Sequence, residues 1–184
     1  MILLLSIVCM VWAEPPEEQE ENLVEEPIDW SKVPEAVLEA QSSAWSEPLG
    51  LRMKLVTESL LGKPYLLNGI GELQEPDPDP LVRYDAFDCL TFVEEAISLS
   101  LGRTPADVDL IRKDLRYGDG VVSYENRNHF MVSQWIPNAI EKGYLKDITH
   151  TLGETHVVSK KITRRTWERW KGRHHFFLTP DQFP

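Results

Sequence analysis

The sequence predicts an α+β domain in which helices come first and strands come later. Residues 33–45, 47–65 and 104–117 carry apolar side chains at helical spacing, whereas residues 147–163 alternate like one or two strands. About 155 residues follow the N-terminal segments, which is the size of one domain. Tryptophans and many aliphatic residues can supply its core.

The first 13 residues are typical of a secretory signal peptide. Met1 to Trp12 carry no charge, and Val11-Trp12-Ala13 fits a cleavage site. The run is too short to cross a bilayer, which takes about 20 residues. Two alternatives are a buried apolar strand and a lipidated Cys9, although no small residue directly precedes Cys9. We therefore predict a periplasmic or secreted protein of bacterial type, without a stable membrane span after cleavage.

Residues 14–30 are predicted to be an acidic, disordered linker. The stretch from Glu14 to Glu26 holds seven glutamates and no basic residue, so it cannot bury enough apolar surface to order itself. The whole chain has a net charge of −11, and residues 27–184 retain −4. This mild acidity of the remaining domain, residues 31–184, argues against a nucleic-acid partner.

The first helices have recognisable ends. The helix in 33–45 has Pro34 at its first position, and the helix in 47–65 ends at Gly62. The Gly, Asp and Pro content of residues 68–80 predicts a loop.

The later elements are expected in the order helix, strand, helix. Thr104 caps the helix in 104–117, and residues 118–130 form a turn, a short strand and another turn. A helix in 128–143 has Asn128 as its N-cap, Gly143 as its terminator and a kink at Pro137. The tail, residues 164–184, is basic and aromatic without a clear period.

The stretch YDAFDCLTFVEE contains the most informative helix start. Asp88 is a good N-cap for the helix that follows. A helical stripe then predicts a core-facing side formed by Cys89, Phe92, Val93, Ala96 and Ile97. Glu94 and Glu95 are expected to point to solvent. Cys89 is thereby placed on the buried side of the first turn.

Cys89 has two readings that the residues alone leave open. With Cys9 removed, it is the only thiol of the exported chain, which suggests a nucleophile. The start of a helix favours the thiolate, the form that attacks acyl carbons. The alternative is a small buried hydrophobe. A redox role is disfavoured because no partner cysteine remains.

His129 is the candidate base, because it is expected in the first turn of its helix beside Arg127 and Asn128. His156 is a second candidate on a strand, and surface roles are the plain reading of any single histidine. No metal, phosphate-loop or serine-hydrolase motif occurs, so no metal and no cofactor are predicted. A sugar groove is a further alternative, lined by Trp135, Trp167, Trp170, Phe176 and Phe177.

Three stretches together resemble a known family. LLGKPYLLNGIGE, FDCLTFVEEAISLSL and YENRNHFMVSQWIPNAIEKGYLKDIT resemble the N-acetylmuramoyl-L-alanine amidase-like family of the NlpC-type papain-like cysteine hydrolases, in order over residues 51–162. The resemblance implies a papain-like α+β fold, with the cysteine on top of a helix that packs against a small antiparallel sheet. It also implies hydrolysis of the amide between N-acetylmuramic acid and L-alanine in peptidoglycan fragments.

By position, the resemblance implies that Cys89 is the nucleophile and Asp88 the acidic residue before it. Arg127, Asn128 and His129 fall on an RNH signature that looks like part of the substrate groove. With His129 also the candidate base, we predict Cys89 and His129 as catalytic residues. The predicted substrate-binding residues are Asp88, Arg127, Asn128 and Tyr84.

The chain also departs from the family pattern. Gly118 stands where the family usually has arginine, and the expected later SH-x-G strand does not occur. This predicts a C-terminally truncated chain with an incomplete sheet. The alternative function is a catalytically dead or truncated cell-wall-binding module of the same fold.

Overall fold

The structure is a computed structural model that describes residues 29–159 together with residues 161, 163, 165, 166 and 169. Its longer helices are α1 (Glu35–Ala44), α2 (Leu49–Leu60), α3 (Cys89–Leu101), α4 (Pro105–Arg116) and α5 (Ile136–Glu141). Short helical turns are η1 (Trp30–Lys32), η2 (Met131–Trp135) and η3 (Thr149–Thr151). The predicted signal peptide, most of the predicted linker and most of the tail lie outside the described residues.

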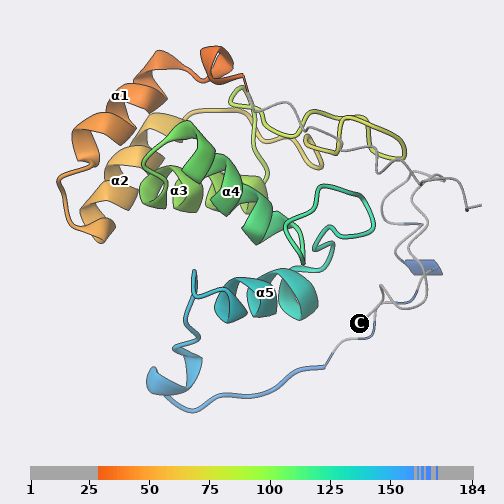
Figure 1. The fold of residues 1–184 in the computed structure, drawn as a ribbon. Helices are drawn as coiled ribbons and strands as arrows, with labels where there is room; N and C mark the ends of the chain where they lie inside the picture. The colour runs from red at the N-terminus through yellow and green to blue at the C-terminus, as the bar shows by residue number, and fades with distance from the viewer. Residues whose placement is uncertain (1–28, 160, 162, 164, 167–168, 170–184) are drawn as a thin grey trace, which may run out of the picture.

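Helices α1 to α4 pack as sequence neighbours: α1 contacts α2, α2 contacts α3, and α3 contacts α4 (Figure 1). Their shared core is built from eight buried side chains: Val33, Val37, Val56, Leu60, Tyr84, Phe87, Leu99 and Val108. Trp30, at the end of the predicted linker, packs against this core from η1. The core therefore surrounds α3, which is buried along most of its length.

The predicted helix starts of α3 and α4 are confirmed by their hydrogen bonds. Asp88 and Thr104 are the N-caps, and each forms a reciprocal capping box with the third residue of its helix. Pro105 occupies the first turn of α4, where its missing N–H removes no helical bond. Gly62, just beyond α2, adopts the left-handed conformation with φ +79°. These ends are set by local sequence.

The helix predicted in 128–143 starts later than expected. It opens with the π-helical turn η2 and continues as α5, with Phe130 at the N-cap position. The Asn128 amide instead donates to the Leu115 carbonyl (3.1 Å), and the Asn128 backbone N–H donates to the Arg116 carbonyl (2.8 Å). The prediction of Asn128 as N-cap is therefore wrong, because this residue ties the chain back to α4.

The predicted papain-like α+β fold with a small antiparallel sheet is contradicted. The part of the chain that the structure describes is helical and contains only isolated bridges, such as Tyr117 with Arg127. The segment 147–163 forms η3 and irregular chain, and its Ile148, Leu152 and Val157 are exposed. Alternation predicts a strand only where a neighbouring strand accepts its hydrogen bonds and a core covers its apolar side, and neither is found for this segment among the described residues.

The predicted faces of α3 are partly wrong: Ala96 and Ile97 are buried as expected, whereas the first turn and the two glutamates are not placed as expected. Cys89 is exposed and Val93 is 40% exposed, whereas Glu94 and Glu95 are 1% and 2% exposed. The two glutamates turn toward α4, which supplies arginines to pair with them. A carboxylate that pairs with an arginine can be buried, whereas an unpaired one cannot. The spacing of apolar residues along a helix does not reveal such a pair.

Within the described residues, no helix combines the length and apolar character that a bilayer crossing requires.

Candidate active site

Cys89 is the first residue of α3, and its thiol is free and exposed. Asp88 caps the helix directly before it: Oδ1 accepts hydrogen bonds from the N–H groups of Leu90 (3.0 Å) and Thr91 (2.8 Å). The Thr91 hydroxyl in turn accepts from the Asp88 N–H (2.9 Å). The cap fixes the backbone on both sides of Cys89 and so holds the thiol at a defined place on the surface.

One backbone donor beside the thiol remains available. Two N–H groups of the first turn are occupied by the Asp88 carboxylate, but the Cys89 N–H has no hydrogen-bond partner among the described residues. Such an N–H at a helix start carries the positive end of the helix dipole. The arrangement can therefore stabilise a negative oxygen that forms next to the Cys89 sulfur.

A second segment runs alongside the start of α3. Leu66 donates its N–H to the Phe87 carbonyl (3.0 Å), and Phe87 donates to the Pro64 carbonyl (3.1 Å). The Asn68 N–H also reaches Asp88 Oδ2 (3.4 Å). Tyr65, within this segment, is 66% exposed. Residues 64–68 thus form an exposed, partly apolar border next to the cysteine.

The loop that follows this border holds Arg127 by three acceptors. Arg127 Nη1 lies 3.2 Å from Glu72 Oε1 and 3.3 Å from Asp77 Oδ2, and Nη2 donates to the Ile70 carbonyl (3.1 Å). The loop from Asn68 to Asp77 thereby contacts Asp88 at one end and Arg127 at the other. One loop therefore connects Asp88 and Arg127, two of the predicted substrate residues. Both side chains form hydrogen bonds within the protein.

Glu72 is the most enclosed carboxyl of this loop. Burial raises its pKa, with Asp77 adding to the rise and Arg127 and the Tyr117 hydroxyl opposing it. Its Oε1 accepts from Tyr117 (3.2 Å), whereas its buried Oε2 has no hydrogen-bond partner. The carboxyl is accordingly easier to protonate than an exposed glutamate.

His129 lies before η2 and not in a helical turn as predicted. Its Nε2 is 2.7 Å from the Tyr124 carbonyl oxygen, and its ring packs on the Tyr124 ring at 4.4 Å between centroids. Because a carbonyl only accepts, Nε2 carries the proton, and Nδ1 of the neutral ring is the basic nitrogen. No hydrogen bond joins the Cys89 thiol to the His129 ring in the structure.

Tyr84 lies in the core and not on the surface. Its hydroxyl donates to Glu95 Oε2 (2.9 Å) and accepts from Arg112 Nη2 (3.3 Å). Burial, followed by the Glu95 charge, raises the pKa of Tyr84 well above its ordinary value. Tyr84, predicted as a substrate residue, is therefore buried and bonded to Glu95 within the core.

Two buried ion pairs between α3 and α4 escaped the sequence reasoning. Arg112 binds both oxygens of Glu95, and Arg116 lies 2.8 Å from Glu94 Oε2. Trp135 Nε1 donates to the other Glu94 oxygen (3.0 Å). Burial opposes the charge of Arg112, yet Glu95 raises its pKa above the ordinary value. One sequence signal could have indicated these pairs: Arg112 and Arg116 are four residues apart and so lie on one face of α4, and α3 carries two adjacent glutamates.

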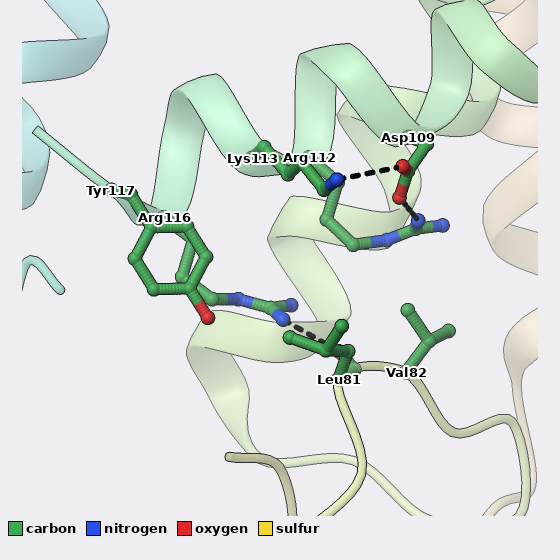
Figure 2. A pocket seen from close by; sticks show the side chains of 7 residues that line it. All are labelled: Leu81, Val82, Asp109, Arg112, Lys113, Arg116 and Tyr117. Carbon is green, nitrogen blue, oxygen red and sulfur yellow. Dashed lines mark hydrogen bonds and ion pairs between the residues drawn. The ribbon is translucent and has the colours of Figure 1, made fainter. Parts of the chain in front are cut away.

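A small cavity lies beside these arginines (Figure 2). Arg116 Nη1 donates to the Leu81 carbonyl (2.6 Å) at its wall. The lining comes from α4 and from the chain before α3: Leu81, Val82, Asp109, Arg112, Lys113, Arg116 and Tyr117. Cys89 and His129 are not among them, so this cavity is not the candidate active site.

The other predicted candidates do not gather at Cys89. His150 is exposed and its Nδ1 lies 3.0 Å from the Thr155 hydroxyl, and His156 is exposed as well. Trp135 is a buried core residue, and the four aromatic residues expected in the tail lie outside the described residues. No cluster of metal-ligating side chains occurs within the described residues.

Comparison with known proteins identifies the family. The N-acetylmuramoyl-L-alanine amidase-like family matches residues 55–177 of the chain. The chain belongs to this family. The narrower NlpC-type placement and the C-terminal truncation stay predictions.

Two solved structures are similar to this family member. Protein LPG0564 from Legionella pneumophila str. Philadelphia 1, described as DUF1460, is 30% identical, with a TM-score of 0.59 over 65% of this chain and 40% of that one. A Bacteroides fragilis protein named as a candidate xylanase is 29% identical, with a TM-score of 0.45 over 52% of this chain and 43% of its own. The chain thus spans about 40% of the length of the Legionella protein. No curated protein matches.

Proposed function

We propose that this chain is an exported cysteine amidase that cleaves the amide bond between N-acetylmuramic acid and L-alanine in peptidoglycan fragments. The observation that carries the proposal is the exposed Cys89 thiol at a capped helix start with an unused N–H beside it. Family membership supports the reaction class. The apolar residues 1–13 support export to the periplasm or beyond.

The first chemical step uses the groups at the start of α3. The Cys89 thiolate attacks the lactyl carbonyl carbon, and the carbonyl oxygen becomes an oxyanion. The Cys89 N–H, with no internal partner, donates to that oxyanion, because Asp88 already occupies the next two N–H groups. Asp88 therefore acts by selecting which amide faces the substrate.

The second step needs a proton donor and then water. We assign the proton transfer to His129, whose Nδ1 is the basic nitrogen while Nε2 is held by the Tyr124 carbonyl. Nδ1 takes the proton of the Cys89 thiol as the thiolate forms. The protonated ring then gives that proton to the L-alanine amine as the carbon–nitrogen bond breaks, and water hydrolyses the thioester and restores the Cys89 thiol. Arg127 and Asn128 hold the backbone of this segment against the Glu72 loop and α4, so they position His129.

The test replaces the nucleophile. Cys89→Ala should abolish release of L-alanine-bearing peptides from purified muropeptides, measured by mass spectrometry. Cys9→Ala is the matched control and should leave release unchanged. His129→Ala should also lose activity, whereas the exposed His150→Ala should not, with circular dichroism to check folding. Undiminished release by Cys89→Ala would refute the proposal.

A second candidate function is a cell-wall-binding module without catalysis. The observation that favours it is that no hydrogen bond joins the Cys89 thiol to the His129 ring, whose Nε2 is held by the Tyr124 carbonyl. This reading expects the wild-type chain to bind peptidoglycan but to release no peptide, and Cys89→Ala to bind equally well. Any peptide release that depends on Cys89 decides against it.

A further inference from the structure

Two arginines stack on one tryptophan at the end of α3 that is opposite to Cys89. Trp45 directly follows α1, Arg52 lies on α2, and Arg103 comes two residues after α3. The guanidinium carbon of Arg52 is 4.4 Å from the centre of the Trp45 ring, and that of Arg103 is 5.3 Å away. Cation–π attraction holds both side chains there. Two positive charges are therefore fixed against the same ring.

Neither guanidinium has an acidic partner. No hydrogen bond or ion pair of the Arg52 or Arg103 guanidinium is found within the described part of the chain; Asp107 accepts only the backbone N–H of Arg103 (3.2 Å). Four other arginines each contact a carboxylate: Arg83, Arg112, Arg116 and Arg127. Like charges held close together without a counter-charge repel each other, and a bound anion removes that repulsion.

The donors of this pair are oriented for a ligand. Arg52 is half-buried, with its Nε inside the protein and without an acceptor, and its guanidinium lies over the Trp45 ring. Its terminal Nη atoms are not buried, and Arg103 is exposed. Stacking uses the faces of the guanidinium planes and leaves the N–H groups in the plane free for a carboxylate.

We infer that Arg52 and Arg103 form a binding site for the carboxylates of acidic peptides. The site stands at the far end of the helix that begins with Cys89. Since α3 has 13 residues and a helix rises about 1.5 Å per residue, roughly 20 Å separate its two ends. An extended anionic polymer contacts both ends at once. The choice of cell-wall peptide as ligand rests on the proposed function, whereas the anion site itself does not.

A contact at this distance affects substrate capture and not the chemical step. It raises the local concentration of polymer at Cys89, so its loss raises KM for peptidoglycan and leaves kcat unchanged. A muropeptide too short to reach both ends gains nothing from it. The effect is largest at low ionic strength, because exposed charges are screened by salt.

The experiment measures binding by titration calorimetry on the full chain at low ionic strength. The probe is the dipeptide L-alanyl-D-glutamate, with inorganic phosphate and phosphatidylglycerol vesicles as separate arms. Arg52→Gln and Arg103→Gln should each weaken dipeptide binding by about tenfold, the loss expected for one charge-assisted contact. Lys54→Gln is the matched control, because it removes one positive charge from the same helix as Arg52. It should bind like the wild type.

Each outcome decides the inference. Unchanged dipeptide binding in Arg52→Gln and Arg103→Gln, equal losses in Lys54→Gln, or no dipeptide binding by the wild type would overturn it. Tighter binding of phosphate or vesicles than of the dipeptide overturns the assignment to carboxylates. Cys89→Ala separates the two proposals: it should bind the dipeptide normally while cleaving nothing. Retained cleavage in that variant refutes the amidase proposal and leaves the anion site intact.

Discussion

Replacing Glu95 by alanine should be among the most damaging changes to the stability of the helix that carries Cys89. The Glu95 side chain is 3% exposed and receives Arg112 on both oxygens, and the Tyr84 hydroxyl donates to it as well. Removal of the carboxylate leaves the guanidinium of Arg112, itself 2% exposed, with the Asp109 contact at 3.2 Å and the neutral Tyr84 hydroxyl at 3.3 Å. A buried positive charge is then left largely uncompensated.

The expected loss follows from that burial. Breaking a buried ion pair by removing one partner costs about 3–5 kcal/mol, because the remaining charge keeps its desolvation penalty. The hydrophobic double replacement Glu95→Leu with Arg112→Met removes both charges together. It should therefore cost much less than the two single changes added, a coupling of neighbours that a double-mutant cycle reveals. Glu95→Gln should lie between wild type and Glu95→Ala.

The assay is urea unfolding followed by circular dichroism, with comparison at a constant m value. The control is Lys54→Ala, which breaks the surface pair with Glu58, whose two side chains are 63% and 49% exposed. That change should cost about 0–1 kcal/mol. A loss below about 1 kcal/mol for Glu95→Ala, or full additivity in the double variant, would show that the pair does not anchor α3 to α4.

Three further predictions test the frame of the site. Gly102→Ala places a Cβ 2.5 Å from Val108 Cγ2 and should cost about 1–3 kcal/mol in urea unfolding; Gly50→Ala, with nothing within 4 Å, should instead stabilise by about 0.5–1 kcal/mol. Asp88→Ala should cost about 1 kcal/mol through loss of the N-cap, and Asp88→Asn should retain most of it, which thermal unfolding can check. Burial raises the pKa of Glu72 above its ordinary 4.5. Its contribution to stability is therefore complete below that value and is lost as pH rises through the folded pKa. Glu72→Gln should flatten this decline in melting temperature; an unchanged slope would contradict the assigned burial effect.

The helix starts could be predicted because their causes are local. Asp88 and Thr104 accept from N–H groups two or three residues ahead, so a short window of sequence contains the whole interaction. The end of α2 is also local, because Gly62 just beyond the helix adopts a positive φ. Local propensity and capping therefore sufficed for α2, α3 and α4.

The faces of α3 could not be predicted in the same way. Glu95 meets its arginine 17 residues along the chain, and Glu94 meets its own 22 residues along. A periodicity argument treats a charged residue as exposed, because it cannot include a partner outside its window. Cys89 was predicted to be buried because it lies on the apolar stripe of α3, yet the residue is exposed.

The prediction of a sheet failed for a related reason. Alternation in residues 147–163 is compatible with a strand, but a strand also needs a partner in space. The relation of Cys89 to His129 depends on the loop from Asn68 to Asp77, which contacts Asp88 and Arg127 through long-range bonds. The sequence indicated the chemical types of the candidate residues and not the distances between them.

The order of helix packing has a consequence for how the protein assembles. Because α1 to α4 each contact the next helix along the chain, the core around α3 forms from contacts between sequence neighbours. Topologies of this kind fold rapidly. The four helices can therefore pack before the chain beyond residue 117 docks on them. Cys89 then already stands at the surface when the His129 segment arrives.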